Sequence, residues 1–260
     1  MATQTPEIVN AALATWLAAH DEVAPDVIEG LYVVGSVALG DWTSHSDLDV
    51  VAVVADPSDP DLANGLAAAH ELVRDRLAMA VDGPYVAWGD LVAPAMAVQR
   101  PWVLDGEYHV DGESFEINPV TWYTLHRYGI PRRGDDPSAI GVAHDVEERR
   151  SWVAENVDTY WRGVGEALAA GLGASSEAEW GGEILEWVAL GVARMLFTFE
   201  TGDVTSKSGA GRWAAERVPQ HAEVFDRAVE VRASPGVVAR DVLERCVQVT
   251  GEIVAAITGH

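Results

Sequence analysis

Cysteine and long hydrophobic runs are both scarce in this chain of 260 residues. The one cysteine, Cys246, has no partner for an internal disulfide, which is typical of a reducing compartment. We therefore expect a cytoplasmic protein with this thiol packed in its interior. No run of 18 apolar residues occurs, and the N-terminus lacks the basic-then-apolar pattern of a signal peptide, so we expect no association with a membrane.

Basic residues are scarce too: 17 Lys and Arg stand against 41 Asp and Glu, and the formal net charge is −24. A nucleic acid would meet a repulsive field with no basic stripe to offset it, so we expect no nucleic-acid partner. The same field would attract small polycations and raise their encounter rate. A solvated acidic surface without a binding role is the alternative. We expect a monomer or a weak oligomer.

The most informative segment starts with an apolar run, Leu31–Val34, that ends in Gly35 and Ser36. Gly35 removes a Cβ where the backbone comes close to another group, and Ser36 offers a hydroxyl and an N–H at a helix start, a common phosphate site. Asp47 and Asp49 open a second apolar run. Residues two apart on a strand share a face, about 7 Å apart at ~3.3 Å per residue. Such paired carboxylates suit two Mg²⁺ ions.

This segment thus combines a candidate phosphate site at Gly35 and Ser36 with carboxylates that suit a metal. The combination predicts a nucleoside triphosphate that is bound through magnesium. The alternative is a strand, a turn and a second strand with two solvated aspartates. The order Gly-Ser, spacer, Asp-x-Asp resembles the signature of the nucleotidyltransferase superfamily.

The hydrophobic pattern predicts an α+β fold with two domains. A mixed sheet with flanking helices is expected over residues 1–130, a linker over 131–142, and an α-helical bundle over 143–260. The expected strands of the first domain cover 31–34, 48–54, 79–81 with 85–88, and 114–118, and its long helices cover 6–20 and 62–77. The expected helices of the second domain cover 143–171, 179–201, 208–217, 219–232 and 236–257.

A second resemblance lies in the helical half. Trp180-Gly181-Gly182-Glu183, then Arg194, then Thr201-Gly202, then Lys207, and finally a Trp-Ala segment closing in Arg217-Val218-Pro219 follow one another along the chain. This order resembles the C-terminal domain of the aminoglycoside (3'')(9) adenylyltransferases, the streptomycin/spectinomycin type. With the first motif, the resemblance covers nearly the whole chain. It implies ATP- and Mg-dependent transfer of AMP to a hydroxyl of an antibiotic, with release of pyrophosphate and resulting resistance.

The resemblance also assigns residues to the nucleotide. Ser36 and Ser46 fall on positions that hold the triphosphate and metal, and Asp47 and Asp49 fall on the magnesium ligands. Arg194 and Lys207 fall on positions through which the helical domain reaches the ATP phosphates. Without the resemblance, a surface salt bridge for the arginine and a loop position for the lysine would be the simpler interpretations.

A general base is needed for the acceptor hydroxyl. The family uses a Glu on the strand after the first helix that covers the sheet, and Asp82 is the candidate here, also as a metal ligand. It is a methylene shorter than Glu, and Gly83 follows directly. A plain turn aspartate is the alternative, and Asp90 and Glu116 are rival bases.

For the acceptor, Glu183 matches an acidic family position that faces the drug, and we expect Glu179 and Glu186 beside it on the same helix. The resemblance thus implies a cationic small-molecule acceptor, with an ordinary solvated helix face as the alternative. Two other functions fit the first motif: a nucleotidyltransferase acting on another small molecule or a protein, and an inactive nucleotide-binding regulatory module.

Overall fold

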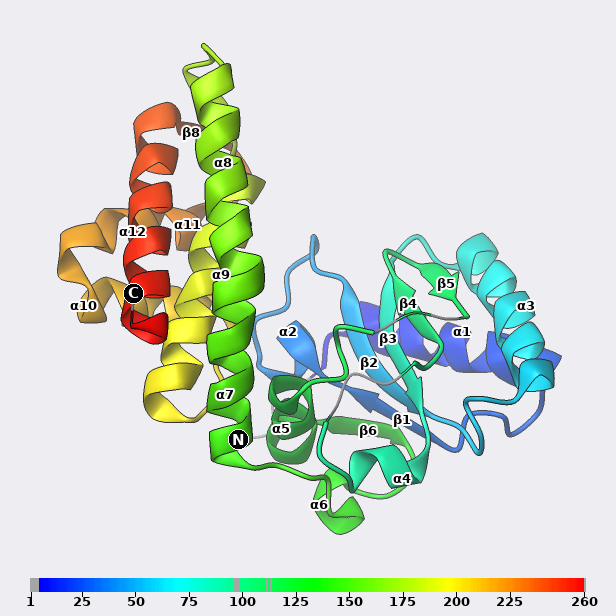
Figure 1. The fold of residues 1–260 in the computed structure, drawn as a ribbon. Coiled ribbons are helices and arrows are strands. Elements are labelled where there is room, and N and C mark those ends of the chain that lie inside the picture. The colour runs from blue at the N-terminus through cyan, green and yellow to red at the C-terminus, as the bar shows by residue number, and fades with distance from the viewer. Residues whose placement is uncertain (1–4, 96–98, 111, 113, 260) are drawn as a thin grey trace. The chain divides into compact units, whose positions relative to one another are not determined.

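The computed structural model describes residues 5–95, 99–110, 112 and 114–259. The chain divides into two compact units, Met1–Asp145 and Val146–His260, which we call the N-terminal unit and the helical unit (Figure 1). The division falls just beyond the predicted linker 131–142. No helix in the described ranges is both long and apolar enough to cross a membrane.

The N-terminal unit is built on a mixed sheet, as the sequence predicted, and this sheet has six strands. The strand order is β5-β4-β3-β2-β1-β6; β2 and β3 run parallel, and the other neighbours run antiparallel. The strands are β1 Gly30–Val33, β2 Leu48–Val53, β3 Val81–Val86, β4 Trp102–Leu104, β5 Glu107–His109 and β6 Ile130–Arg133.

Helices cover both faces of this sheet because each face carries an apolar set of alternating residues. On one face, Leu48, Val50 and Tyr85 pack against Trp16 and Leu66. These two belong to α1 (Glu7–Val23) and α3 (Pro60–Arg76), close to the helices predicted at 6–20 and 62–77. The second face packs on α4 (Trp88–Leu91) and α5 (Pro119–Tyr128). Short helices α2 (Gly35–Ala38) and α6 (Pro137–Ile140) complete the unit.

One strand prediction near the edge of the sheet was wrong, and one edge strand was not predicted. Residues 114–118 form turns, not a strand, and Asn118 accepts hydrogen bonds from the N–H groups of Val120 and Thr121 as the N-cap of α5. The predicted linker contains β6, an edge strand that tolerates Pro131 because an edge position leaves one side of the backbone unpaired.

The strand predicted as interrupted near Asp82 is continuous. β3 runs through Gly83, whose φ of +142° and missing Cβ let the backbone lie directly against the Val50 carbonyl of β2. The β4–β5 hairpin was not predicted from the sequence. Its turn is Asp105-Gly106 with φ values of +51° and +73°, the conformation that a two-residue hairpin turn requires.

The helices of the helical unit lie close to the predicted ranges (Figure 1). Its elements are α7 Val146–Asn156, a π-helical turn Val157–Trp161, α8 Arg162–Ala174, β7 Glu179–Gly181, α9 Gly182–Thr201, α10 Lys207–Arg217, a 3-10 turn Pro219–His221, α11 Ala222–Ala233, β8 Val237–Ala239 and α12 Arg240–Thr258. The short β7–β8 pair was not predicted. Cys246 is fully buried, as expected.

Candidate active site

Three carboxylates meet at one end of the central strands. Asp49 on β2 pairs in register with Asp82 on β3, and Asp47 lies two residues before Asp49. Asp49 has the same parity as Val51 and Val53, so the carboxylates share the face of the sheet that α5 covers. Asp47 is exposed, Asp49 is half-buried and Asp82 is buried.

Gly35 lies directly against the Asp49 carboxylate. Its φ is +56°, and a Cβ at this position would overlap the Asp49 carboxylate. The Val34 N–H also donates to the Asp49 carbonyl at 2.9 Å. The hydroxyl oxygen of Ser36 is buried and has no hydrogen-bond partner among the described residues. The two halves of the sequence motif therefore lie together, with one buried hydroxyl still to be satisfied.

Asp82 is held by the hairpin that the sequence analysis missed. Its two carboxylate oxygens accept hydrogen bonds from the backbone N–H groups of Asp105 at 3.0 Å and Gly106 at 2.9 Å. Burial raises the pKa of Asp82 to about 6, with Asp47 and Asp49 adding to the rise and the two N–H groups opposing it. Asp82 is thus a carboxylate near neutral pH and can still accept a proton.

Glu116 belongs to the same charge cluster, although it lies in the turn before α5 and not on the predicted strand. Burial raises its pKa to about 9, and the charges of Asp49 and Asp82 add to the rise. Its Oε2 atom is buried without a hydrogen-bond partner among the described residues. Glu116 is therefore protonated at neutral pH, which favours Asp82 over Glu116 as a proton acceptor.

The third rival base, Asp90, is occupied elsewhere. It follows the opposite end of β3, on α4. Its carboxylate pairs with Arg100 at 2.8 Å and 2.9 Å and accepts from the Ala87 N–H at 2.9 Å. Burial alone would raise the pKa of Asp90, but these partners hold it below its usual value. The structure gives Asp90 a role in packing α4 and not in the carboxylate cluster.

The carboxylates suit magnesium in one particular way. No three Asp, Glu, His or Cys side chains in the described ranges form a ready-made metal site. Mg²⁺ commonly uses one or two carboxylates and takes its remaining ligands from water and substrate phosphates. Asp47 and Asp49, which are not fully buried, fit that pattern better than an all-protein cage.

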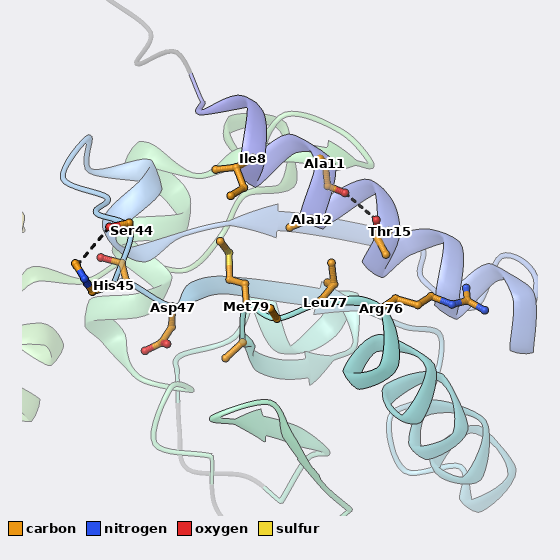
Figure 2. A pocket seen from close by; sticks show the side chains of 13 residues that line it. Ile8, Ala11, Ala12, Thr15, Ser44, His45, Asp47, Arg76, Leu77 and Met79 are labelled. Carbon is orange, nitrogen blue, oxygen red and sulfur yellow. Dashed lines mark hydrogen bonds between the residues drawn. The ribbon is translucent and has the colours of Figure 1, made fainter.

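Ser46 lies in the turn that delivers Asp47. Its hydroxyl accepts from the Thr43 N–H at 3.2 Å and bonds the Thr43 hydroxyl at 3.1 Å. Ser46 and Asp47 border a cavity of about 460 Å³, whose other walls include Ile8 on α1 and Met79 before β3 (Figure 2). This cavity places an apolar wall next to the Asp47 carboxylate.

Basic residues predicted to bind phosphate form a cluster within the helical unit. Lys207 begins α10, Arg194 lies on α9, and the charge of Arg194 acts on the Lys207 amine. Glu186 of α9 contacts Lys207 at 3.2 Å and Arg232 of α11 at 2.6 Å. The sequence analysis did not identify Arg232, which lies 25 positions beyond Lys207 in the chain.

The three acidic residues assigned to the acceptor lie in different settings. Glu183 is exposed in the first turn of α9, as an acceptor-binding carboxylate should be. Glu179 is also exposed, but it lies on β7 and not on the helix, because the chain pairs with β8 before α9 begins. Glu186 is partly buried and its carboxylate is engaged by two cations. The predicted common acidic face is therefore reduced to Glu179 and Glu183.

Two protein-family profiles match the chain. The profile "Nucleotidyltransferase domain" matches residues 20–82, which include the Gly-Ser motif and all three aspartates. The profile "Aminoglycoside adenylyltransferase, C-terminal domain" matches residues 151–255, which include the basic cluster.

Among solved structures, the chain is similar to the spectinomycin adenyltransferase AAD(9) of Enterococcus faecialis, whose crystal structure contains ATP and spectinomycin. The TM-score is 0.70 at 14% sequence identity, and the match covers 94% of this chain and 98% of that chain. At this identity the likeness shows a common fold. No curated protein matches the sequence.

Proposed function

The chain belongs to the aminoglycoside adenylyltransferase family of nucleotidyltransferases, and we propose that it transfers AMP from ATP to a hydroxyl of a cationic aminocyclitol or aminoglycoside. The observation that carries the proposal is the meeting of Gly35 and Ser36 with Asp49 and Asp82 at one end of the sheet. A structural module has no need for a left-handed glycine that makes room for a carboxylate.

In the proposed reaction, Asp47 and Asp49 hold magnesium, with the ATP phosphates as further ligands. Bound magnesium would neutralise the triphosphate and the charge that develops on the departing pyrophosphate. The unsatisfied hydroxyl of Ser36 and its N–H would bind a phosphate oxygen. Ser46 borders the same site and would contribute its hydroxyl once the turn to Thr43 opens.

Asp82 would accept the proton of the acceptor hydroxyl while the hydroxyl oxygen attacks the α-phosphorus. The bond from the α-phosphorus to the bridging oxygen breaks, and pyrophosphate leaves with that electron pair. A base with a pKa of about 6 is ready at neutral pH, whereas Glu116 already carries its proton. Glu116 would instead donate a hydrogen bond to a phosphate oxygen.

The helical unit would supply the remaining charges. Arg194 and Lys207 would bind the phosphates, since cations are needed to balance a triphosphate in an otherwise acidic chain. Glu179 and Glu183, both exposed, would bind ammonium or guanidinium groups of the acceptor. The net charge of −24 would also attract such an acceptor from a distance.

The test is to incubate the purified protein with ATP, magnesium and a panel of aminocyclitols and aminoglycosides, and to weigh each compound for added AMP. We expect AMP on at least one spectinomycin- or streptomycin-class compound. Asp49→Asn is the control for background hydrolysis. ATP binding without any modified compound would favour the regulatory module, and AMP on a different molecule or protein would replace the proposed acceptor.

A further inference from the structure

Lys207 occupies an unfavourable position for its charge. It is the only lysine in the chain and the first residue of α10. A cation at a helix N-terminus is opposed by the helix dipole, and the first turn of α10 holds no acidic residue to offset it. Local conflicts of this kind are expected where a residue serves function and not stability.

Two cations from different helices converge on one oxygen atom. Glu186 Oε1 on α9 accepts from Lys207 Nζ at 3.2 Å and from Arg232 Nη1 at 2.6 Å. The Arg232 side chain is only 5% exposed, compared with 30% for Lys207. The shorter and more buried contact is the stronger one. Glu186 is thus anchored by Arg232, while the longer contact to Lys207 orients an amine that can still exchange its partner.

We propose that Glu186 and Arg232 are positioning residues for the amine of Lys207. Arg232 fixes the Glu186 carboxylate, and the carboxylate holds the ammonium at the start of α10 in one orientation. This inference rests on the proposed function, in which Lys207 binds the ATP phosphates. It replaces the acceptor contact that the sequence predicted for Glu186.

The charges around the amine give the two residues opposite effects on it. Burial lowers the pKa of Lys207, and Arg194 from α9 and Arg232 from α11 lower it further; Glu186 from α9 opposes the change. Removing the Glu186 charge should therefore lower the pKa again. Removing the Arg232 charge should raise it, because a repulsive cation is lost and Glu186 is left to pair with Lys207 alone.

A single lysine makes this measurable without any substrate. Protein containing ¹³C-labelled lysine gives one lysine Cε signal by NMR, that of Lys207, and its chemical shift follows the protonation of the amine. We expect the titration midpoint to fall by about half a pH unit or more in Glu186→Gln and to rise in Arg232→Gln. Arg227→Gln is the matched control, since Arg227 lies on the same helix and pairs with exposed Glu230.

ATP affinity supplies the second measurement, by calorimetry with magnesium and no acceptor. Arg232→Gln should weaken binding about three- to tenfold at pH 7, since the ammonium is drawn toward Glu186 and is correctly oriented in only a fraction of molecules. Glu186→Gln should weaken binding increasingly from pH 7 to pH 9, because Lys207 loses its proton earlier. Thermal denaturation checks the fold of each variant. If Glu186→Gln does not fold, Glu186→Asp replaces it: this variant keeps the charge but is one methylene shorter, so it should loosen the contact to Lys207 and lower the midpoint by less.

Unchanged midpoints, or midpoints that move in the same direction, would overturn the proposal, as would ATP affinities equal to that of Arg227→Gln. The proposed function can fail separately. If no aminocyclitol receives AMP but the midpoints move in opposite directions and ATP affinity follows them, the positioning role stands and the acceptor is wrong. If AMP is transferred while the midpoints stay fixed, the positioning role alone is wrong.

Discussion

Strand β3 places Tyr85 on one face of its sheet and Asp82 on the other, and the polar groups around these two side chains differ in their hydrogen bonds. On the face covered by α1 and α3, the Tyr85 hydroxyl bonds His20 at 2.8 Å and His70 at 2.6 Å. His20 also donates from Nδ1 to the Trp16 carbonyl at 2.8 Å. Burial lowers the pKa of His20 to about 4 and that of His70 to about 3, so both rings are neutral.

On the other face, Asp82 accepts two backbone hydrogen bonds, but other buried polar atoms have no partner among the described residues. Burial and like charges raise the pKa of Asp82 and Glu116, and Ser36 Oγ and Glu116 Oε2 have no hydrogen-bond partner in the described ranges. Both clusters are buried, so burial does not separate structure from function. The difference is that Tyr85, His20 and His70 bond one another, whereas Ser36 and Glu116 keep open polar atoms beside two further carboxylates. Trp16 Nε1 and Tyr108 Oη next to the histidines also lack a partner in the part of the chain that the structure describes, so it is the combination of open polar atoms with several carboxylates that points to a ligand.

The largest effect should come from the carboxylate cluster. Asp49→Asn removes the charge of a proposed metal ligand while preserving its shape. Transfer should fall at least ~100-fold, because the proposed metal-borne stabilisation of the reacting phosphate would be lost. The melting temperature should stay the same or rise, since the charge that opposes Asp82 and Glu116 is gone. Rates of AMP transfer and thermal denaturation, measured together with Asp47→Asn, check this. Full activity in both variants would contradict the metal assignment.

The cluster of Tyr85, His20 and His70 should behave in the opposite way. Tyr85→Phe leaves His20 and His70 without the hydroxyl they share, which should reduce the free energy of unfolding by about 2–4 kcal/mol. The kcat/KM for AMP transfer should stay within about twofold of the parent. Urea unfolding and steady-state kinetics are the measurements, and Phe197→Leu in the helical unit is a control for an ordinary aromatic change. A large loss of kcat/KM without loss of stability would show that the two faces are coupled.

Lowering the pH should reduce the stability of the protein through His20 and His70 and increase it through Glu116. His20 and His70 have folded pKa values below that of a free histidine, so their contribution to stability is complete above pH 6.5 and is lost as the pH falls toward about 4 and about 3. Glu116 has a folded pKa raised to about 9, so the folded state retains a proton that the unfolded state releases above pH 4.5, and stability is lost as the pH rises through this interval.

Glu116→Gln isolates the second of these effects, since Gln imitates the protonated acid. The variant should be as stable as the parent at pH 4.5 and more stable at pH 8, by at least about 1 kcal/mol. Denaturant unfolding across this pH range is the measurement. A gain that does not change with pH would mean that Glu116 is ionised in the folded protein.

The smallest effect is expected for a carboxylate that lies in water. Glu183→Gln should weaken binding of a cationic acceptor by a factor of about 1.4 to 5 and leave ATP affinity unchanged, because an exposed ion pair contributes roughly 0.2–1 kcal/mol. Binding should also weaken with salt, since charges farther apart than about 8 Å are screened at physiological ionic strength. Calorimetry with parent, Glu183→Gln and Glu179→Gln separates the two exposed carboxylates. Equal acceptor affinity in all three would place both outside the acceptor site.

The sequence predicted those features that depend on local pattern. The mixed sheet, the long helices and the joining of Gly35 with Asp49 follow from periodicity and motif spacing. It could not predict which polar groups the fold buries together. Glu116 is a rival base on a predicted strand that does not form, and nothing in the sequence showed that it or Tyr85 would be desolvated by packing. The Arg232 pair with Glu186 likewise joins distant segments.

One missed feature did carry a local signal. Asp105-Gly106 directly after the apolar run Trp102–Leu104 is a strong hairpin pattern, and it predicts the turn between β4 and β5. At Gly83 the local pattern gave a wrong prediction, an interrupted strand, because a glycine followed by a proline resembles a turn. Here they mark a close approach between β3 and β2.

The β4–β5 hairpin also makes the pKa of Asp82 depend on the shape of a loop. Both donors that hold Asp82 are main-chain groups of the turn, so replacing a side chain at position 105 leaves them in place as long as the turn keeps its conformation. An insertion or deletion there is another matter. Surface turns usually accept such changes at little thermodynamic cost, but one added residue in this turn would withdraw two N–H groups from Asp82, the proposed base. The length of this loop is thereby tied to the pH at which the proposed base can accept a proton.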